Sequence, residues 1–110
     1  MFMAFSDSQK IDILALVNAL EDQDLRVRQM AREELSELGR PAILPLLSAL
    51  VERFDSAPLR QGAHYVFNTL KNHGQLTVPE SHVYAALHGL VPEVEAPWVA
   101  QEALKGLIGP

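Results

Sequence analysis

The chain has 110 residues, enough for one domain, and its 48% apolar and 21% charged residues are typical of a folded globular protein. This composition excludes a disordered tail. Nine basic and 14 acidic residues give a net charge of −5, which disfavours non-specific binding to nucleic acid or to an anionic membrane surface. Cysteine is absent, so disulfide bonds, thiolate metal sites and cysteine nucleophiles are excluded.

Neither the N-terminal residues nor the apolar runs have the pattern of a targeting or membrane segment. The chain begins MFMAFSD, without the basic stretch and the apolar core of a secretory signal. The longest nearly apolar run, residues 42–51, contains Pro45 and Ser48 and is too short to cross a bilayer. We therefore expect a cytoplasmic protein with no membrane partner.

Apolar residues recur at helical spacing along the chain, and no segment alternates with period two. Asp24 and the Thr77–Glu80 capping box predict helix starts, and Gly39 and Gly74 predict helix ends. The pattern predicts an all-α chain with helices over residues 8–21, 25–38, 41–53, 58–72, 79–90 and 97–108. Pro45 falls inside the third helix, where we expect a kink or a more tightly wound first turn.

Two of these helices carry the same sequence pattern. Residues 27–38 and 59–70 both read apolar-Arg-x-x-Ala-x-x-x-apolar-x-x-Leu, with an offset of 32. Residues 96–107 keep the small and apolar positions but have proline in place of the arginine. The helices before them also correspond, since ILALVNAL at 13–20 is similar to ILPLLSAL at 43–50. Three such hairpins predict an α-solenoid, with one domain over 1–110 and units at about 8–39, 41–73 and 77–108.

Residues 16–31, LVNALEDQDLRVRQMA, resemble a HEAT repeat, and more narrowly the HEAT-like repeats of phycobilisome lyases. The shared features are an apolar first helix, an acidic turn that ends in Asp, and Val-Arg with a small residue at the start of the second helix. The resemblance implies an all-α, HEAT/ARM-like superhelix of about three antiparallel hairpins. It also implies a ladder in which Asp22 pairs with Arg28 and Asp55 with Arg60.

No group of residues has the spacing that catalysis or metal binding requires. The four histidines, at 64, 73, 82 and 88, lack the zinc-protease spacing, and none is followed by the Glu that HEAT-like di-iron hydroxylases use. The acidic run at 21–24 lacks the glycine and the distal glutamate of a calcium loop. We therefore expect no enzyme activity, no metal, no cofactor and no nucleic-acid partner.

The resemblance places the second helix of each unit on the concave side of the solenoid. The outward positions there predict a binding strip, with Trp98 as its anchor because aromatic and arginine residues dominate interface energies. An alternative is that Tyr65 and Trp98 only pack against the core. The residues of the predicted strip are Arg32, His64, Tyr65, Asn68, Trp98 and Gln101.

The final helix ends on Leu104, Leu107 and Ile108 with little polar cover, although the end of a repeat array normally has a polar outer face. A protein partner or a second copy of the chain would cover this apolar end, or further repeats would follow it in a longer array. The remaining alternative is a monomeric cap of unusual composition. The sequence thus predicts a non-catalytic protein-interaction or scaffold module. The alternative function is a lyase-type or chaperone-like subunit that handles a chromophorylated protein.

Overall fold

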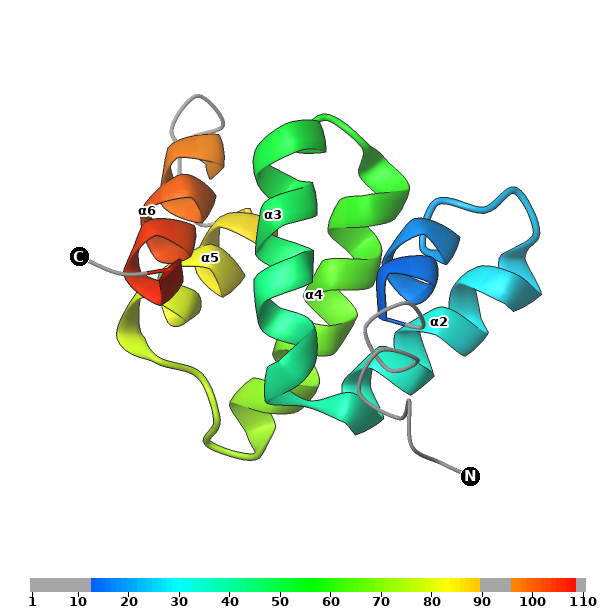
Figure 1. The fold of residues 1–110 in the computed structure, drawn as a ribbon, viewed down its shortest axis with the longest axis horizontal. Coiled ribbons are helices and arrows are strands. Elements are labelled where there is room, and N and C mark those ends of the chain that lie inside the picture. Colours follow the sequence, from blue (N-terminus) through cyan, green and yellow to red (C-terminus); the bar gives the residue numbers. More distant parts are fainter. Residues whose placement is uncertain (1–12, 90–95, 109–110) are drawn as a thin grey trace.

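The computed structural model describes residues 13–89 and 96–108, and these residues are 82% helical with no strand. The predicted all-α class is therefore confirmed. A helical segment over residues 13–19 is followed by α2 (Leu25–Leu38), the short 3-10 helix η1 (Arg40–Ala42), α3 (Ile43–Arg53), α4 (Ala57–Asn72), α5 (Val78–Leu87) and α6 (Ala96–Ile108), all drawn in Figure 1. The predicted first helix, 8–21, begins outside the described residues.

The helix ends follow the predicted capping signals except in α5. The Asp24 side chain accepts a hydrogen bond from Arg26 N at 2.9 Å, and Thr77 forms a capping box with Glu80. Gly39 ends α2 at a φ of 74°, which favours glycine. α5 ends at Leu87, three residues before the predicted end at 90, because the chain turns at Gly89 with a φ of 81°.

Pro45 lies in the first turn of α3 and does not interrupt the helix. α3 begins at Ile43, so the missing N–H of Pro45 is among those that have no intrahelical acceptor in any helix. The expected tighter winding lies just upstream, in the 3-10 turn Arg40–Ala42. Tight winding thus occurs at the start of the predicted helix 41–53, but the kink or tighter winding expected at Pro45 itself is absent, because Pro45 lies in regular α-helix.

The first two hairpins repeat each other in detail. The N-cap residues of α2 and α4, Asp24 and Ser56, are separated by the same 32 residues as the sequence pattern. Ala31 and its equivalent Ala63 are both fully buried, which lets each second helix approach its neighbour closely.

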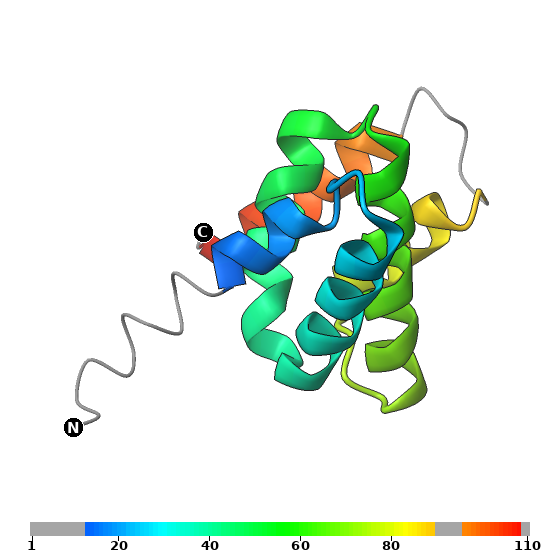
Figure 2. The same ribbon diagram turned by 90° about the vertical axis from the view of Figure 1, so that its right-hand side faces the viewer.

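The third hairpin is reversed with respect to the first two. α2, α4 and α5 lie side by side in one layer, whereas α6 packs against α3 in the other, as Figure 2 shows from the side. The expectation that α6 continues the layer of α2 and α4 is therefore wrong. Side-chain fit explains the exchange: the buried side chains described on α6 are the small Ala96, Ala100 and Ala103, whereas α5 carries aromatic rings that stack on α4, described below.

The core lies between the two layers and includes Phe67, the largest fully buried side chain. Leu20, directly after the helical segment over residues 13–19, packs closely against α4. A Cβ atom built on Gly62 of α4 would lie 2.6 Å from Cδ2 of Leu20, so only glycine allows this approach. The other large, fully buried apolar residues are Leu20, Leu35, Ile43, Leu46, Leu47, Leu50, Leu59, Val66, Leu70 and Val83.

A buried ion pair fixes the start of α5. Arg40, in η1, donates from Nη1 to the carboxylate of Glu80 and to Gln75 O, the latter at 3.2 Å. Glu80 is 1% exposed, and its Oε1 also accepts from the backbone N–H of Thr77 at 3.0 Å. One arginine thus holds both the α4–α5 connection and the first turn of α5.

Candidate functional site

The two arginines of the expected ladder bind backbone carbonyls and not carboxylates. Arg28 Nη1 donates to Asp22 O at 2.9 Å, and Arg60 Nη1 donates to Phe54 O. Each guanidinium therefore closes the turn six residues before it. Arg28 thus contacts Asp22 as expected, but through the backbone carbonyl. Within the described ranges no ion pair joins Arg60 to Asp55, so this second expected pair is not formed.

The predicted binding strip is divided between two surfaces. α6 packs against α3 and α5, so its residues do not extend the row on α2 and α4. Arg32 comes from α2, His64, Tyr65 and Asn68 come from α4, and Trp98 and Gln101 come from α6.

The α4–α5 cluster consists of His64, Asn68 and Lys71 of α4 with Tyr84 and His88, at the end of α5. His64 Nε2 lies 2.9 Å from His88 Nδ1, and the Tyr84 hydroxyl donates to Asn68 Oδ1 at 2.7 Å. The rings of His64 and Tyr84 stack with centroids 5.1 Å apart, and Lys71 Nζ lies 5.6 Å from the Tyr84 centroid. The spacing i, i+4, i+7 on α4 and i, i+4 on α5 puts these side chains on facing sides of the two helices.

The hydrogen bond between the two imidazoles constrains their protonation. One ring nitrogen must carry a proton and the other must lack it, so the bond is lost when both rings are charged. Burial, and secondly the positive charge of His88, lower the pKa of His64 below its ordinary value of 6.5. His64 is therefore predominantly neutral at pH 7.

Trp98 lies at the edge of a hollow of about 180 Å³ between α5 and α6, called here the Trp98 hollow. The Trp98 side chain is 72% exposed, so the alternative that it is a packing residue is wrong; Tyr65, at 37%, is only marginally exposed. The hollow is lined by Pro79, His82, Trp98, Val99 and Glu102.

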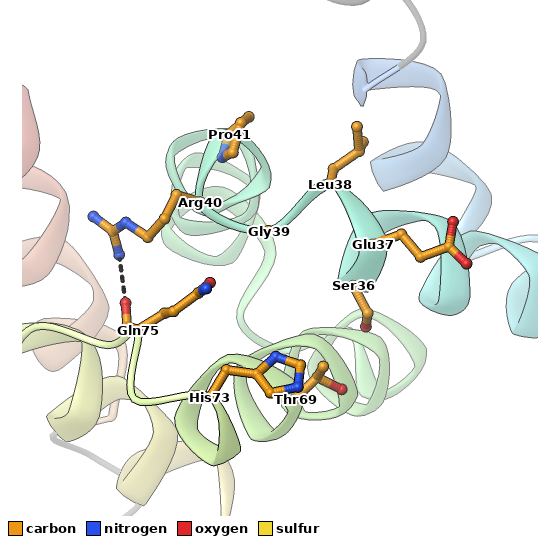
Figure 3. Close-up of a pocket in the computed structure, with 9 residues that line it drawn as sticks. All are labelled: Ser36, Glu37, Leu38, Gly39, Arg40, Pro41, Thr69, His73 and Gln75. Carbon is orange, nitrogen blue, oxygen red and sulfur yellow. Dashed lines mark hydrogen bonds between the residues drawn. The ribbon is translucent and has the colours of Figure 1, made fainter.

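A larger hollow of about 500 Å³ lies where α2 and α4 end (Figure 3). Ser36 from α2 and Thr69 and His73 from α4 point into it, and Gln75 closes one side, where its carbonyl accepts from Arg40. The Ser36 hydroxyl is buried and has no hydrogen-bond partner in the described part of the structure. The polar groups that line it belong to helix ends and connections.

In the C-terminal helix, Leu104 is less exposed than the sequence suggests. Leu104 is partly buried and lines a groove with Leu14 and Leu44, between the segment over residues 13–19 and α3. Leu107 is 37% exposed. The side chain of Ile108 lies outside the description, so the expectation of an uncovered apolar end concerns Leu107 alone.

The sequence reasoning missed Tyr84 and His88 as partners of His64. The signal was present as an aromatic and a histidine four residues apart on the fifth helix, but nothing in the sequence indicated that this helix faces the fourth. Among residues 13–89 and 96–108 no group of three or more His, Asp or Glu side chains is placed to hold a metal ion. In the same ranges no helix is long and apolar enough to span a membrane.

Comparison with known protein families, curated proteins and solved structures finds no match to this chain.

Proposed function

We propose that the chain is a non-catalytic protein-interaction module that binds its partner through the Trp98 hollow. One observation carries this proposal: the only tryptophan of the chain is 72% exposed. Because a tryptophan side chain buries about 150–250 Å² when covered, covering the exposed part of Trp98 would contribute about 3–4.5 kcal/mol of hydrophobic stabilisation at about 25 cal/mol per Å², from which the cost of association is subtracted.

The surroundings of Trp98 support its role as an anchor. Pro79 and Val99 supply apolar walls, while His82 and Glu102 supply polar groups at the edge. An apolar centre with a polar rim is the usual composition of a protein interface. The underside of α6 is fixed by the buried Ala100 and Ala103, so the ring projects from a helix that is itself well packed.

The HEAT-like repeat of the first two hairpins supports the same class of function. Repeats of this kind stack hairpins into a scaffold and use exposed helix faces to bind other proteins. In this proposal the reversed third hairpin ends the repeat, and its exposed face is the binding surface. The partner is another protein, in which we include a second copy of this chain.

The test compares proteins captured from a lysate of the source organism by the wild type and by two variants. Trp98→Ala removes the anchor, and Leu25→Ala removes a similarly exposed apolar side chain, 62% exposed, at the start of α2. We expect the captured protein to be lost with Trp98→Ala and kept with Leu25→Ala, while both variants unfold at the wild-type denaturant concentration. Equal capture by Trp98→Ala and the wild type would contradict the proposal.

A further inference from the structure

A hollow of about 350 Å³ lies beside the α4–α5 cluster, at the start of α4, and is called here the Arg60 hollow. Its polar lining consists of one guanidinium, two imidazoles and one amide. No carboxylate is among the lining residues that the structure describes, which are Ala57, Arg60, Gln61, His64, Leu87 and His88.

The nitrogen atoms around this hollow have unused hydrogen-bonding capacity. Arg60 donates one Nη1 hydrogen to Phe54 O, and its guanidinium has five N–H groups. His64 and His88 use one ring nitrogen each for their mutual contact. When both imidazoles are protonated, their mutual hydrogen bond is lost and every ring N–H can donate to a ligand, and together with Arg60 they place three positive charges at one site.

Among the described residues no ion pair involves Arg60. On α4, Lys71 lies over the Tyr84 ring and adds positive charge. Asp55 lines a neighbouring hollow with Arg60, yet no ion pair joins the two in the described structure. Glu93 and Glu95 belong to the linker before α6, which lies outside the described residues, so the experiment below treats them explicitly.

We propose that the Arg60 hollow binds an oxyanion, a carboxylate or a phosphate group, and that binding is coupled to protonation of both His64 and His88. The anion supplies the negative charge that the lining lacks, and in return it stabilises the doubly charged histidine pair. By linkage, an anion that binds the doubly charged pair tenfold more tightly than the neutral pair raises the two titration midpoints by about one pH unit in total, or about half a unit each. This inference does not depend on the protein partner of the Trp98 hollow.

The test follows the four histidine ring resonances by proton NMR between pH 5 and 8. Sulfate is the probe for a phosphate-like ligand, acetate is the probe for a carboxylate, and chloride at equal ionic strength is the reference. His73 and His82 lie at other hollows and serve as internal controls. We expect sulfate or acetate to raise the midpoints of His64 and His88 by about half a unit or more above the shift of the controls. The probe with the larger effect identifies the ligand class.

Two results would overturn the proposal: equal shifts of all four histidines, which would mean general screening, or no shift beyond the chloride reference. His88→Gln keeps a hydrogen-bonding side chain but removes one titrating group, and it should abolish the selective shift of His64. A full selective shift in this variant would also overturn it. If the shift appeared only after Glu93→Gln and Glu95→Gln, the linker would supply the anion, and the proposed external ligand would be wrong.

Discussion

The ion pair between Arg40 and Glu80 allows a sharp prediction, because its two members differ in burial. The Glu80 side chain is 1% exposed and the Arg40 side chain is 40% exposed. Removing Arg40 leaves a buried carboxylate without its counter-ion, whereas removing the charge of Glu80 leaves a guanidinium that water can still reach. Arg40→Met should therefore destabilise the protein more than Glu80→Gln.

The structure sets the size of both effects. Breaking a buried ion pair costs about 3–5 kcal/mol when the remaining charge stays buried, which applies to Arg40→Met. In Glu80→Gln, Oε1 can still accept from Thr77 N, but an amide NH2 replaces Oε2, which already has no partner. An unsatisfied buried donor costs about 1–3 kcal/mol. Since a domain of this size is stable by about 5–15 kcal/mol, both changes should be measurable.

The assay is urea unfolding of the wild type and both variants at pH 7, followed by circular dichroism. We expect Arg40→Met to lower the urea midpoint more than Glu80→Gln does. A larger loss for Glu80→Gln, or equal losses for the two variants, would contradict this prediction.

Three further predictions concern packing, pH and capping. Gly62→Ala should lower the free energy of unfolding by about 1–2 kcal/mol, because its Cβ atom would overlap Leu20. Gly106→Ala should raise the free energy of unfolding by up to about 1 kcal/mol, because no atom lies within 4 Å of the added Cβ and alanine favours the helix. Urea midpoints measure both changes. Because the pKa of His64 is lowered, the stability that its neutral form contributes is complete above pH 6.5 and is lost as the pH falls below that value. Unfolding from pH 8 to 5 should therefore depend less on pH in His64→Gln, and equal slopes would contradict this. Asp24→Ala and Ser56→Ala should each cost about 1 kcal/mol in thermal or urea unfolding, and unequal effects would argue against equivalent caps.

The elements that could be predicted from the sequence are those fixed by local chemistry. Asp24, Thr77 and Gly39 act through hydrogen bonds and backbone angles within a few residues, so their roles follow from their neighbours in the chain. The 32-residue repeat could also be predicted, because it is a pattern of residue types along the chain. Its equivalent small residues, Ala31 and Ala63, are both fully buried.

The arrangement of the third hairpin could not be predicted, because it depends on contacts between distant residues. The Arg40–Glu80 pair spans 40 residues, and the sequence identified Glu80 only as part of a capping box. The stacking of Tyr84 and His88 on His64 likewise depends on which layer α5 joins. Extending the repeat by pattern alone therefore assigned α6 to the wrong layer and joined Trp98 to a strip on α2 and α4.

The exposure of Trp98 in solution tests the proposed function most directly. Because the chain has a single tryptophan, acrylamide quenching of its fluorescence reports on this side chain without labelling. We expect strong quenching in the dilute protein and marked protection once the captured partner is added. A Trp98 that is shielded from acrylamide in the dilute, monomeric protein, or that stays equally accessible in the complex, would show the proposed function to be wrong.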